Sequence, residues 1–146
     1  MSNYLIRKAL IEDVEEIFKL EQDYPSDSYS KQTIINSLND ERTITLLIYD
    51  NKECVGYVSF NYIFDESSII KIVVLSSRRR NGIGGKLLLH AITLMRSLGV
   101  KQINLEVRND NMPAKALYES VGFKKIHQRQ KYYSDGMSAD IYLLCL

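Results

Sequence analysis

The sequence has no tryptophan, only two prolines and two cysteines, and no apolar run that approaches the length of a membrane span. A helix needs about 20 consecutive apolar residues to cross a bilayer, so we expect no membrane partner. The first residues lack a basic stretch followed by an apolar one, so we expect no signal peptide. Cys54 and Cys145 are too few for a disulfide framework. We therefore expect reduced thiols and a cytoplasmic protein.

Histidine is also scarce, and this argues against two kinds of chemistry. Only His90 and His127 occur, and neither stands at metal-ligand spacing from cysteine or aspartate, so we expect no metal. Both cysteines fall in apolar strand patterns with no histidine placed to activate them, which argues against a cysteine nucleophile. The net charge of +1 and the missing tryptophan argue against direct binding of nucleic acid.

The small net charge hides two halves of opposite sign. Residues 1–66 hold six basic and thirteen acidic side chains, whereas residues 67–146 hold thirteen basic and five acidic ones. Such a division suggests an anionic ligand for the second half and a cationic ligand, such as an amine, for the first. The alternative is that the charges merely cover solvated faces. The length of 146 residues and a hydrophobic content of 45% predict a single domain over residues 1–146.

The hydrophobic pattern predicts alternating strands and helices. Ile11, Val14 and Ile17 recur at helical spacing, and Ser30 is a predicted N-cap for the next helix. We expect helices at 11–23, 30–38, 83–98 and 113–121. We expect strands at 3–8, 43–49, 54–62, 68–75, 101–107, 123–133 and 137–145, the last two forming a hairpin. This order predicts an α+β fold with a mixed, largely antiparallel sheet of about seven strands and about four helices.

The stretch from residue 72 to residue 86 has the composition of a phosphate-binding turn. An apolar strand ends, a glycine-rich basic turn follows and a helix opens, so backbone N–H groups and arginines can surround an anion. A P-loop is excluded because Arg80 replaces its first glycine and Leu87 its Ser or Thr. A dinucleotide-binding fingerprint is excluded because Leu87 replaces its third glycine. A glycine-rich turn with solvated arginines is the alternative to an anion site.

This turn resembles the pyrophosphate loop of the GCN5-related N-acetyltransferases, whose pattern is Arg/Gln-x-x-Gly-x-Gly/Ala. The matching residues are Arg79, Arg80, Asn81, Gly82, Ile83 and Gly84. The runs at 105–111, 116–123 and 129–140 extend the resemblance over residues 70–146. It is closest to the RimI-type branch, which acetylates the N-terminal amine of a small-subunit ribosomal protein. The resemblance implies a GNAT-type sheet and acetyl-CoA as co-substrate.

The resemblance also implies which residues react. It assigns Glu106 as general base, often acting through water, and Tyr118, twelve residues further on, as the acid that protonates the thiolate of CoA. An ordinary phenol has a pKa near 10 and a thiol one near 8.5, which suits this proton transfer. The alternatives are that Glu106 is a surface residue of a strand and that Tyr118 belongs to the core.

For the cofactor, the resemblance implies that the backbone of Ile72, Val73 and Val74 pairs with the pantetheine amides, with the Val74 N–H polarising the thioester carbonyl. Asn111 would contact pantetheine, cap the helix that begins near Pro113, or both. The pyrophosphate would lie on Arg79, Arg80, Asn81, Gly82, Ile83, Gly84 and Gly85. Arg78 exceeds the pattern, so that the three arginines either reach the 3′-phosphate or face water.

The acceptor amine is the open question. At pH 7, deprotonation costs about 1 kcal/mol for an α-amine and about 4.6 kcal/mol for a lysine, which favours a protein N-terminus for a lone glutamate base. Tyr24, Tyr29, Tyr132 and Tyr133 could line the acceptor groove. The first alternative is a small-molecule acetyltransferase that acts on a polyamine or an aminoglycoside, and the second is a module that binds acetyl-CoA without turnover. We expect a monomer or a weak dimer.

Overall fold

The computed structural model describes residues 2–146, which form one seven-stranded sheet in the order β1-β2-β3-β4-β5-β7-β6. The strands are β1 (Tyr4–Lys8), β2 (Thr43–Asp50), β3 (Glu53–Ile63), β4 (Glu66–Val74), β5 (Gln102–Arg108), β6 (Lys124–Arg129) and β7 (Ala139–Cys145). The helices are α1 (Val14–Glu21), α2 (Lys31–Asn39), α3 (Ile83–Ser97) and α4 (Met112–Ser120). Short 3-10 turns are η1 (Ile11–Asp13), η2 (Pro25–Asp27) and η3 (Ser76–Arg78). The predicted α+β class is confirmed.

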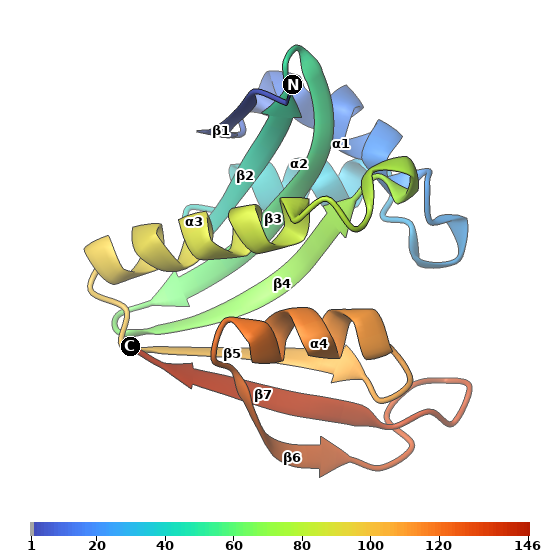
Figure 1. Ribbon diagram of the computed structural model, residues 1–146, viewed down its shortest axis with the longest axis vertical. Coiled ribbons are helices and arrows are strands. Elements are labelled where there is room, and N and C mark those ends of the chain that lie inside the picture. Colours follow the sequence, from blue (N-terminus) through green and yellow to red (C-terminus); the bar gives the residue numbers. More distant parts are fainter. Residues whose placement is uncertain (1) are drawn as a thin grey trace.

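Helices cover both faces of the sheet (Figure 1). On one face, buried side chains of α3, including Leu87 and Met95, pack against the strands and share their cluster with Tyr118 of α4. On the other face, Ile17 of α1 and Ile34 of α2 form a second cluster over β2 and β3. Alternate residues of a strand point to opposite faces, and β2, β3 and β4 contribute to both clusters. No helix within residues 2–146 is long and apolar enough to span a membrane.

Several helix ends that were predicted from capping residues agree with the structure. The Ser30 side chain accepts a hydrogen bond from Thr33 N at 3.2 Å, and the Asn111 side chain accepts one from Ala114 N at 3.2 Å. Gly99 follows α3 with a φ of 88°, a left-handed conformation that ends a helix. The helix expected at 11–23 is shorter than predicted, because its first turn is the 3-10 turn η1.

The C-terminal hairpin differs from the prediction. The strands were expected to run through Tyr133 and to begin again at residue 137, but β6 ends at Arg129 and β7 begins at Ala139. Lys131 has a φ of 50°, which is incompatible with an extended strand. Asp135 then accepts hydrogen bonds from Met137 N at 3.0 Å and from Arg108 at 2.6 Å, which closes a longer loop. Tyr132 and Tyr133 are therefore loop residues.

Strands β4 and β5 separate inside the sheet. They are parallel neighbours only from Glu66 to Ser68, and the Ser68 hydroxyl donates to Asn104 Oδ1 at 2.8 Å near the end of this pairing. The register between β3 and β4 shifts at Ile70, which has no partner in β3 and so forms a bulge. A bulge bends its strand. Beyond it, β4 stays paired with β3 but leaves β5, and Figure 1 shows the two strands diverging.

An ion pair lies under the C-terminal end of α1. Glu21 is 1% exposed and accepts hydrogen bonds from Lys71 Nζ at 2.7 Å, from Tyr29 N at 2.8 Å and from the Tyr57 hydroxyl. Lys71 belongs to β4, donates to the Asp27 carbonyl oxygen at 2.6 Å and lies 3.8 Å from the centre of the Tyr29 ring. The pair therefore attaches α1 and the loop after it to the free part of β4.

Replacing Lys71 by methionine should lower the free energy of unfolding by about 3–5 kcal/mol, because the Glu21 carboxylate would be left buried without its cation. Urea unfolding of both proteins measures this difference. Lys31→Met is the matched control, since its ion pair with Glu15 is exposed and should contribute less than about 1 kcal/mol. Equal effects of the two substitutions would contradict the structural role of Lys71.

Candidate active site

A cavity of about 550 Å³ opens where β4 leaves β5. Its walls come from the free end of β4, the turn that follows, the first turn of α3, the first half of α4 and the loop between α1 and α2. The lining residues are Glu21, Tyr24, Ser26, Asp27, Lys71, Ile72, Val73, Val74, Arg78, Arg79, Arg80, Gly82, Ile83, Gly84, Gly85, Asn111, Pro113, Ala114 and Leu117. Segments far apart in the sequence thus meet at one opening in the sheet.

The cavity gathers the residues that the sequence assigned to the cofactor, with one exception. Ile72, Val73, Val74, Arg79, Arg80, Gly82, Ile83, Gly84, Gly85 and Asn111 all line it. Asn81 does not, because its side-chain amide turns back and donates to the carbonyl oxygens of Arg78 at 3.0 Å and Arg79 at 3.3 Å. Asn81 shapes the turn rather than the wall of the cavity.

The start of α3 is suited to an anion. Its N-cap is Gly82, which supplies no capping side chain, so the first N–H groups of the helix lack the partners that Ser30 and Asn111 give to α2 and α4. Gly82 has a φ of 75° and Arg80 a φ of 67°, and these left-handed residues form the tight turn before the helix. An uncapped helix N-terminus beside arginines attracts negatively charged groups.

Asn111 fills one of its two predicted roles, that of helix cap, and is placed at the cavity for the other. Its side-chain oxygen caps α4, as the hydrogen bond from Ala114 N shows. Its side-chain nitrogen has no hydrogen-bond partner within residues 2–146, and the residue lines the cavity. The amide is therefore able to donate to a ligand while it caps the helix.

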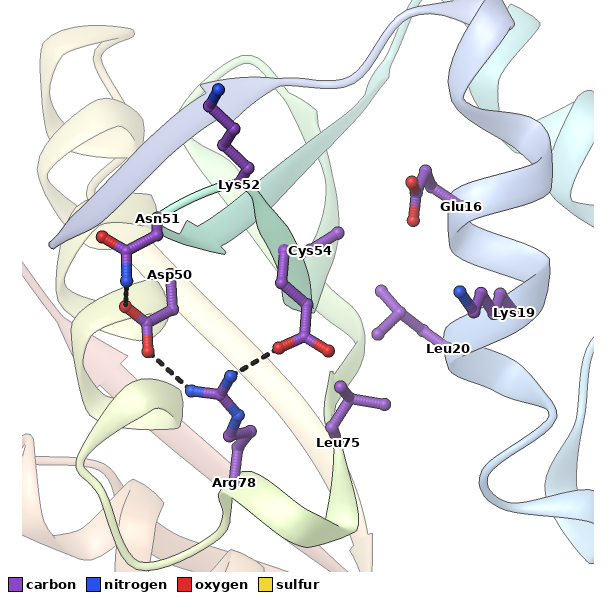
Figure 2. A pocket seen from close by; sticks show the side chains of 10 residues that line it. Glu16, Lys19, Leu20, Asp50, Asn51, Lys52, Cys54, Leu75 and Arg78 are labelled. Atoms are coloured by element: carbon purple, nitrogen blue, oxygen red, sulfur yellow. Dashed lines mark hydrogen bonds and ion pairs between the residues drawn. The ribbon is translucent and has the colours of Figure 1, made fainter. Parts of the chain in front are cut away.

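Arg78 lies between this cavity and a second one of about 630 Å³. Figure 2 shows its guanidinium directed at Asp50 in the second cavity. Arg78 pairs with Asp50 at 2.6 Å and also with Glu53. Burial would raise the pKa of Asp50, but hydrogen bonds from Arg78 and Asn3 N outweigh burial and lower it. Arg78 is thus bound to two carboxylates, which does not support a role in binding a 3′-phosphate.

The second cavity also contains Cys54, which is buried between α1 and the turn joining β2 to β3. Burial raises the pKa of its thiol to about 11, so the thiol stays protonated at neutral pH. Cys145 is exposed near the end of β7 and does not line the first cavity. Neither placement favours a cysteine nucleophile.

Tyr118 lies in α4, just behind the cavity wall. Its ring is buried and makes an edge contact with Phe123, with ring centres 5.8 Å apart. Burial raises the pKa of Tyr118 to about 12. No group within residues 2–146 hydrogen-bonds its hydroxyl, and no fully buried side-chain oxygen there lacks a partner, so the hydroxyl retains access to solvent. A core ring with a free hydroxyl is consistent with both readings of Tyr118.

The Glu106 side chain projects from the face of the sheet opposite to the one that carries Tyr118. Its neighbours Leu105 and Val107 are buried among the residues packed by α3 and α4, so Glu106 points to the α1 and α2 side. The side chain is 37% exposed and lies 3.7 Å from Arg129 Nη1. Glu106 and Tyr118 therefore lie on opposite sides of β5, the strand that borders the opening.

The loop between β6 and β7 carries two of the candidate groove tyrosines. Tyr133 lies against Arg108 of β5, with the guanidinium carbon 5.0 Å from the ring centre. Burial, and to a smaller extent the charge of Glu106, raises the pKa of Tyr133. Tyr132 packs edge-on against Tyr133, with ring centres 5.2 Å apart. Of the four candidate groove tyrosines, Tyr24 lines the cavity and Tyr29 lies against Lys71. Tyr132 lies against Arg129, the ion-pair partner of Glu106, and Tyr133 against Arg108.

Sequence reasoning did not assign seven of the lining residues to the site: Glu21, Ser26, Asp27, Lys71, Pro113, Ala114 and Leu117. Lys71 had a visible signal, because it is the one charge within the apolar run from Ile69 to Leu75. The loop residues had none, since their approach to β4 depends on how α1 packs. Acidic side chains of the first half and arginines of the second half thus line the same cavity. No group of three or more potential metal ligands occurs within residues 2–146.

The acetyltransferase (GNAT) family matches residues 10–123, which is most of the chain. The chain therefore belongs to this family and is an acyltransferase. An N-alpha-acetyltransferase from Sulfurisphaera tokodaii is 29% identical to it, and the match covers 97% of this chain and 91% of the relative.

Two solved structures extend the comparison. The ribosomal-protein-S18-alanine N-acetyltransferase from Escherichia coli superposes with a TM-score of 0.91 and 29% identity, covering 98% of this chain and 94% of that one. A chain of the NatC complex bound to Gag peptide and CoA superposes with a TM-score of 0.86 and 26% identity, covering 99% of each chain. The fold is thus shared with an acetyltransferase named for a ribosomal protein and with a chain of a complex that binds a peptide and CoA.

Gly84 provides a test of the cavity as the cofactor site. A Cβ at this position would lie 3.2 Å from Leu117 Cδ2 and 3.9 Å from Val74 Cγ2, and both neighbours line the cavity. Gly84→Val should push Leu117 into the cavity and weaken the binding of CoA by at least about ten-fold in calorimetry.

Gly84→Ala is the matched control, because the flexible end of Leu117 is able to yield to a single methyl group, and its effect should be several times smaller. A folded Gly84→Val protein, as judged by its thermal melting, that binds CoA with undiminished affinity would show that the cofactor binds elsewhere.

Proposed function

We propose that this protein transfers the acetyl group of acetyl-CoA to the N-terminal α-amine of a protein. The observation that carries the proposal is the free edge of β4, which lies beside the uncapped start of α3 in one cavity. A strand edge binds an extended chain of amides, and a helix N-terminus binds phosphate. Coenzyme A joins these two features in one molecule, since its pantetheine arm carries amides and its nucleotide end carries phosphates.

Each part of the cofactor is assigned to one part of the cavity. Its pantetheine amides pair with the backbone of β4 from Ile72 to Val74, and the Val74 N–H polarises the thioester carbonyl. Its pyrophosphate lies at the first turn of α3, where Arg80 has no protein partner among the described residues. Asn111 contributes its free side-chain nitrogen from the side of α4.

The acceptor reaches the thioester from the other face of the sheet, to which the Glu106 side chain points. Glu106, directly or through a water molecule, takes a proton from the ammonium form of the amine, and the neutral nitrogen then attacks the carbonyl carbon. The new C–N bond forms as the C–S bond breaks, and the nitrogen loses its second proton to solvent. The Tyr118 hydroxyl gives its proton to the departing thiolate and regains one from solvent. With a pKa near 12, Tyr118 carries that proton at neutral pH.

The α-amine fits this site better than a lysine, because a single carboxylate has to deprotonate the acceptor. At neutral pH, deprotonation costs much less free energy for an α-amine than for a lysine. The named relatives support the same choice, since one is an N-alpha-acetyltransferase and another acts on ribosomal protein S18. We therefore propose a small-subunit ribosomal protein as acceptor and the cytoplasm as the place of reaction. The protein is proposed to act as a single domain without a metal.

The acceptor is tested by incubating the protein with acetyl-CoA and a panel of amines. The panel contains N-terminal peptides of small-subunit ribosomal proteins, the same peptides with blocked N-termini, polyamines and aminoglycosides. We expect a mass gain of one acetyl group on free α-amines only, located by fragment mass spectrometry. A gain restricted to small amines would overturn the proposed acceptor, and binding without turnover would favour a non-catalytic module.

Replacing Glu106 by glutamine should slow acetylation of the best peptide by about a hundred-fold or more at pH 7, with the affinity for acetyl-CoA unchanged. The deficit should shrink as the pH rises towards 9, because an α-amine with a pKa near 8 then loses its proton without a base. Steady-state rates between pH 6 and pH 9 measure both effects.

Glu41→Gln is the matched control, because Glu41 is exposed and lies in the turn before β2, far in the fold from the cavity. It should leave the rate unchanged. A Glu106→Gln protein with the rate and pH profile of the unmodified protein would remove Glu106 from the mechanism. Tyr118→Phe tests the acid in the same assay, and an unchanged rate would assign Tyr118 to the core alone.

A further inference from the structure

Tyr24 connects three segments around the cavity. It lies three residues after the end of α1, and its hydroxyl donates a hydrogen bond to the Val74 carbonyl oxygen at 2.6 Å. The same hydroxyl accepts a hydrogen bond from Arg79 Nε at 3.0 Å. The guanidinium of Arg79 also lies 5.0 Å from the centre of the Tyr24 ring. One side chain therefore touches both the end of β4 and the turn before α3.

The Val74 carbonyl belongs to the free edge of β4. Leu75 N donates to Val55 O at 2.9 Å, so the backbone groups of Leu75 point towards β3. Alternate residues of an antiparallel strand direct these groups to opposite sides, so those of Val74 point away from β3, towards the opening. Tyr24 thus occupies an acceptor on the edge that β5 has left.

Asp23, the residue before Tyr24, reinforces this contact. Its carboxylate accepts a hydrogen bond from Ser76 N at 2.7 Å, at the start of η3. That hydrogen bond, with a smaller contribution from the nearby Arg79, lowers the pKa of Asp23. The end of α1 therefore fixes the chain at Val74, at Ser76 and at Arg79, which are the residues leading into the phosphate turn.

Only one nitrogen of the Arg79 guanidinium, Nε, makes a hydrogen bond within the described residues. Its Nε bonds to Tyr24, whereas its two terminal nitrogens have no hydrogen-bond or ion-pair partner within residues 2–146. Arg79 lines the cavity together with Arg80 and Gly82. A guanidinium that is fixed at Nε and stacked on a ring still offers two terminal donors to a phosphate.

We propose that Tyr24 is a positioning residue that orients Arg79 towards the phosphates of the cofactor. The inference rests on the proposed binding of CoA in this cavity. It adds a residue of the loop between α1 and α2 to the phosphate site. A free arginine loses much conformational entropy when it binds a phosphate, and a preoriented one loses less. Tyr24 therefore increases cofactor affinity without touching the cofactor phosphates.

The test is a double-mutant cycle on the dissociation constant of CoA, measured by calorimetry without any acceptor. Tyr24→Phe removes the hydroxyl and keeps the ring, and it should weaken CoA binding by about five-fold, the usual effect of one hydrogen bond. In an Arg79→Gln background, the same change should weaken binding by less than about two-fold, because the residue through which Tyr24 acts is gone.

Tyr62→Phe is the matched control, since it removes a hydroxyl from β3 that has no hydrogen bond among the described residues and does not line the cavity. It should leave CoA affinity unchanged, and thermal melting of every variant verifies folding. An equal effect of Tyr24→Phe in both backgrounds, or no effect in either, would overturn the inference. Failure of the unmodified protein to bind CoA would instead overturn the proposed function on which the inference depends.

Discussion

The free edge of β4 is the constraint on which the rest of the site depends. Backbone N–H and C=O groups away from bulk water need partners, and a strand inside a sheet normally finds them on both sides. Here the bulge at Ile70 turns β4 away from β5 after only three paired residues. The chain satisfies the Val74 carbonyl with Tyr24 and leaves the rest of the edge facing a cavity. In the proposed function, this gap within a single sheet is the binding surface for an extended molecule.

Each side of this gap is held by a buried carboxylate. On the β4 side, Glu21 is bound to Lys71 and to the loop after α1. On the β5 side, Asp140 of β7 is fully buried and pairs with Lys115 of α4 at 2.9 Å. Burial alone would raise the pKa of Asp140, but hydrogen bonds from Lys115 and neighbouring polar groups hold it well below its usual range. Because charges buried in this way resist separation, the two sides keep their shape although few backbone bonds join them.

The sequence predicted the features that depend on local chemistry. The turn before α3 could be predicted because glycines and arginines stand at fixed positions in it. The N-caps Ser30 and Asn111 could be predicted because a capping side chain bonds to a backbone N–H only three residues away. The separation of β4 from β5 left no such signal, since Ile70 is as apolar as its neighbours and its bulge arises from pairing with β3. Arg78 was grouped with two neighbouring arginines, yet its direction depends on Asp50 and Glu53, which are distant in the sequence. The length of the hairpin loop was missed because the positive φ of Lys131 and the contacts of Asp135 with Arg108 are not visible in the pattern.

The opposite charges of the two halves acquire a physical meaning in this fold. The basic second half supplies the turn proposed to bind phosphate, and the acidic first half supplies Asp27, an exposed carboxylate at the cavity, whereas Glu21 is neutralised by Lys71. In the proposed reaction an anionic cofactor and a cationic amine are therefore attracted to different sides of one opening and meet within it. Acetylation converts the cationic amine into a neutral amide. The product then loses its attraction to the carboxylates that drew the substrate in, so the charge distribution that favours binding of the amine also favours release of the amide.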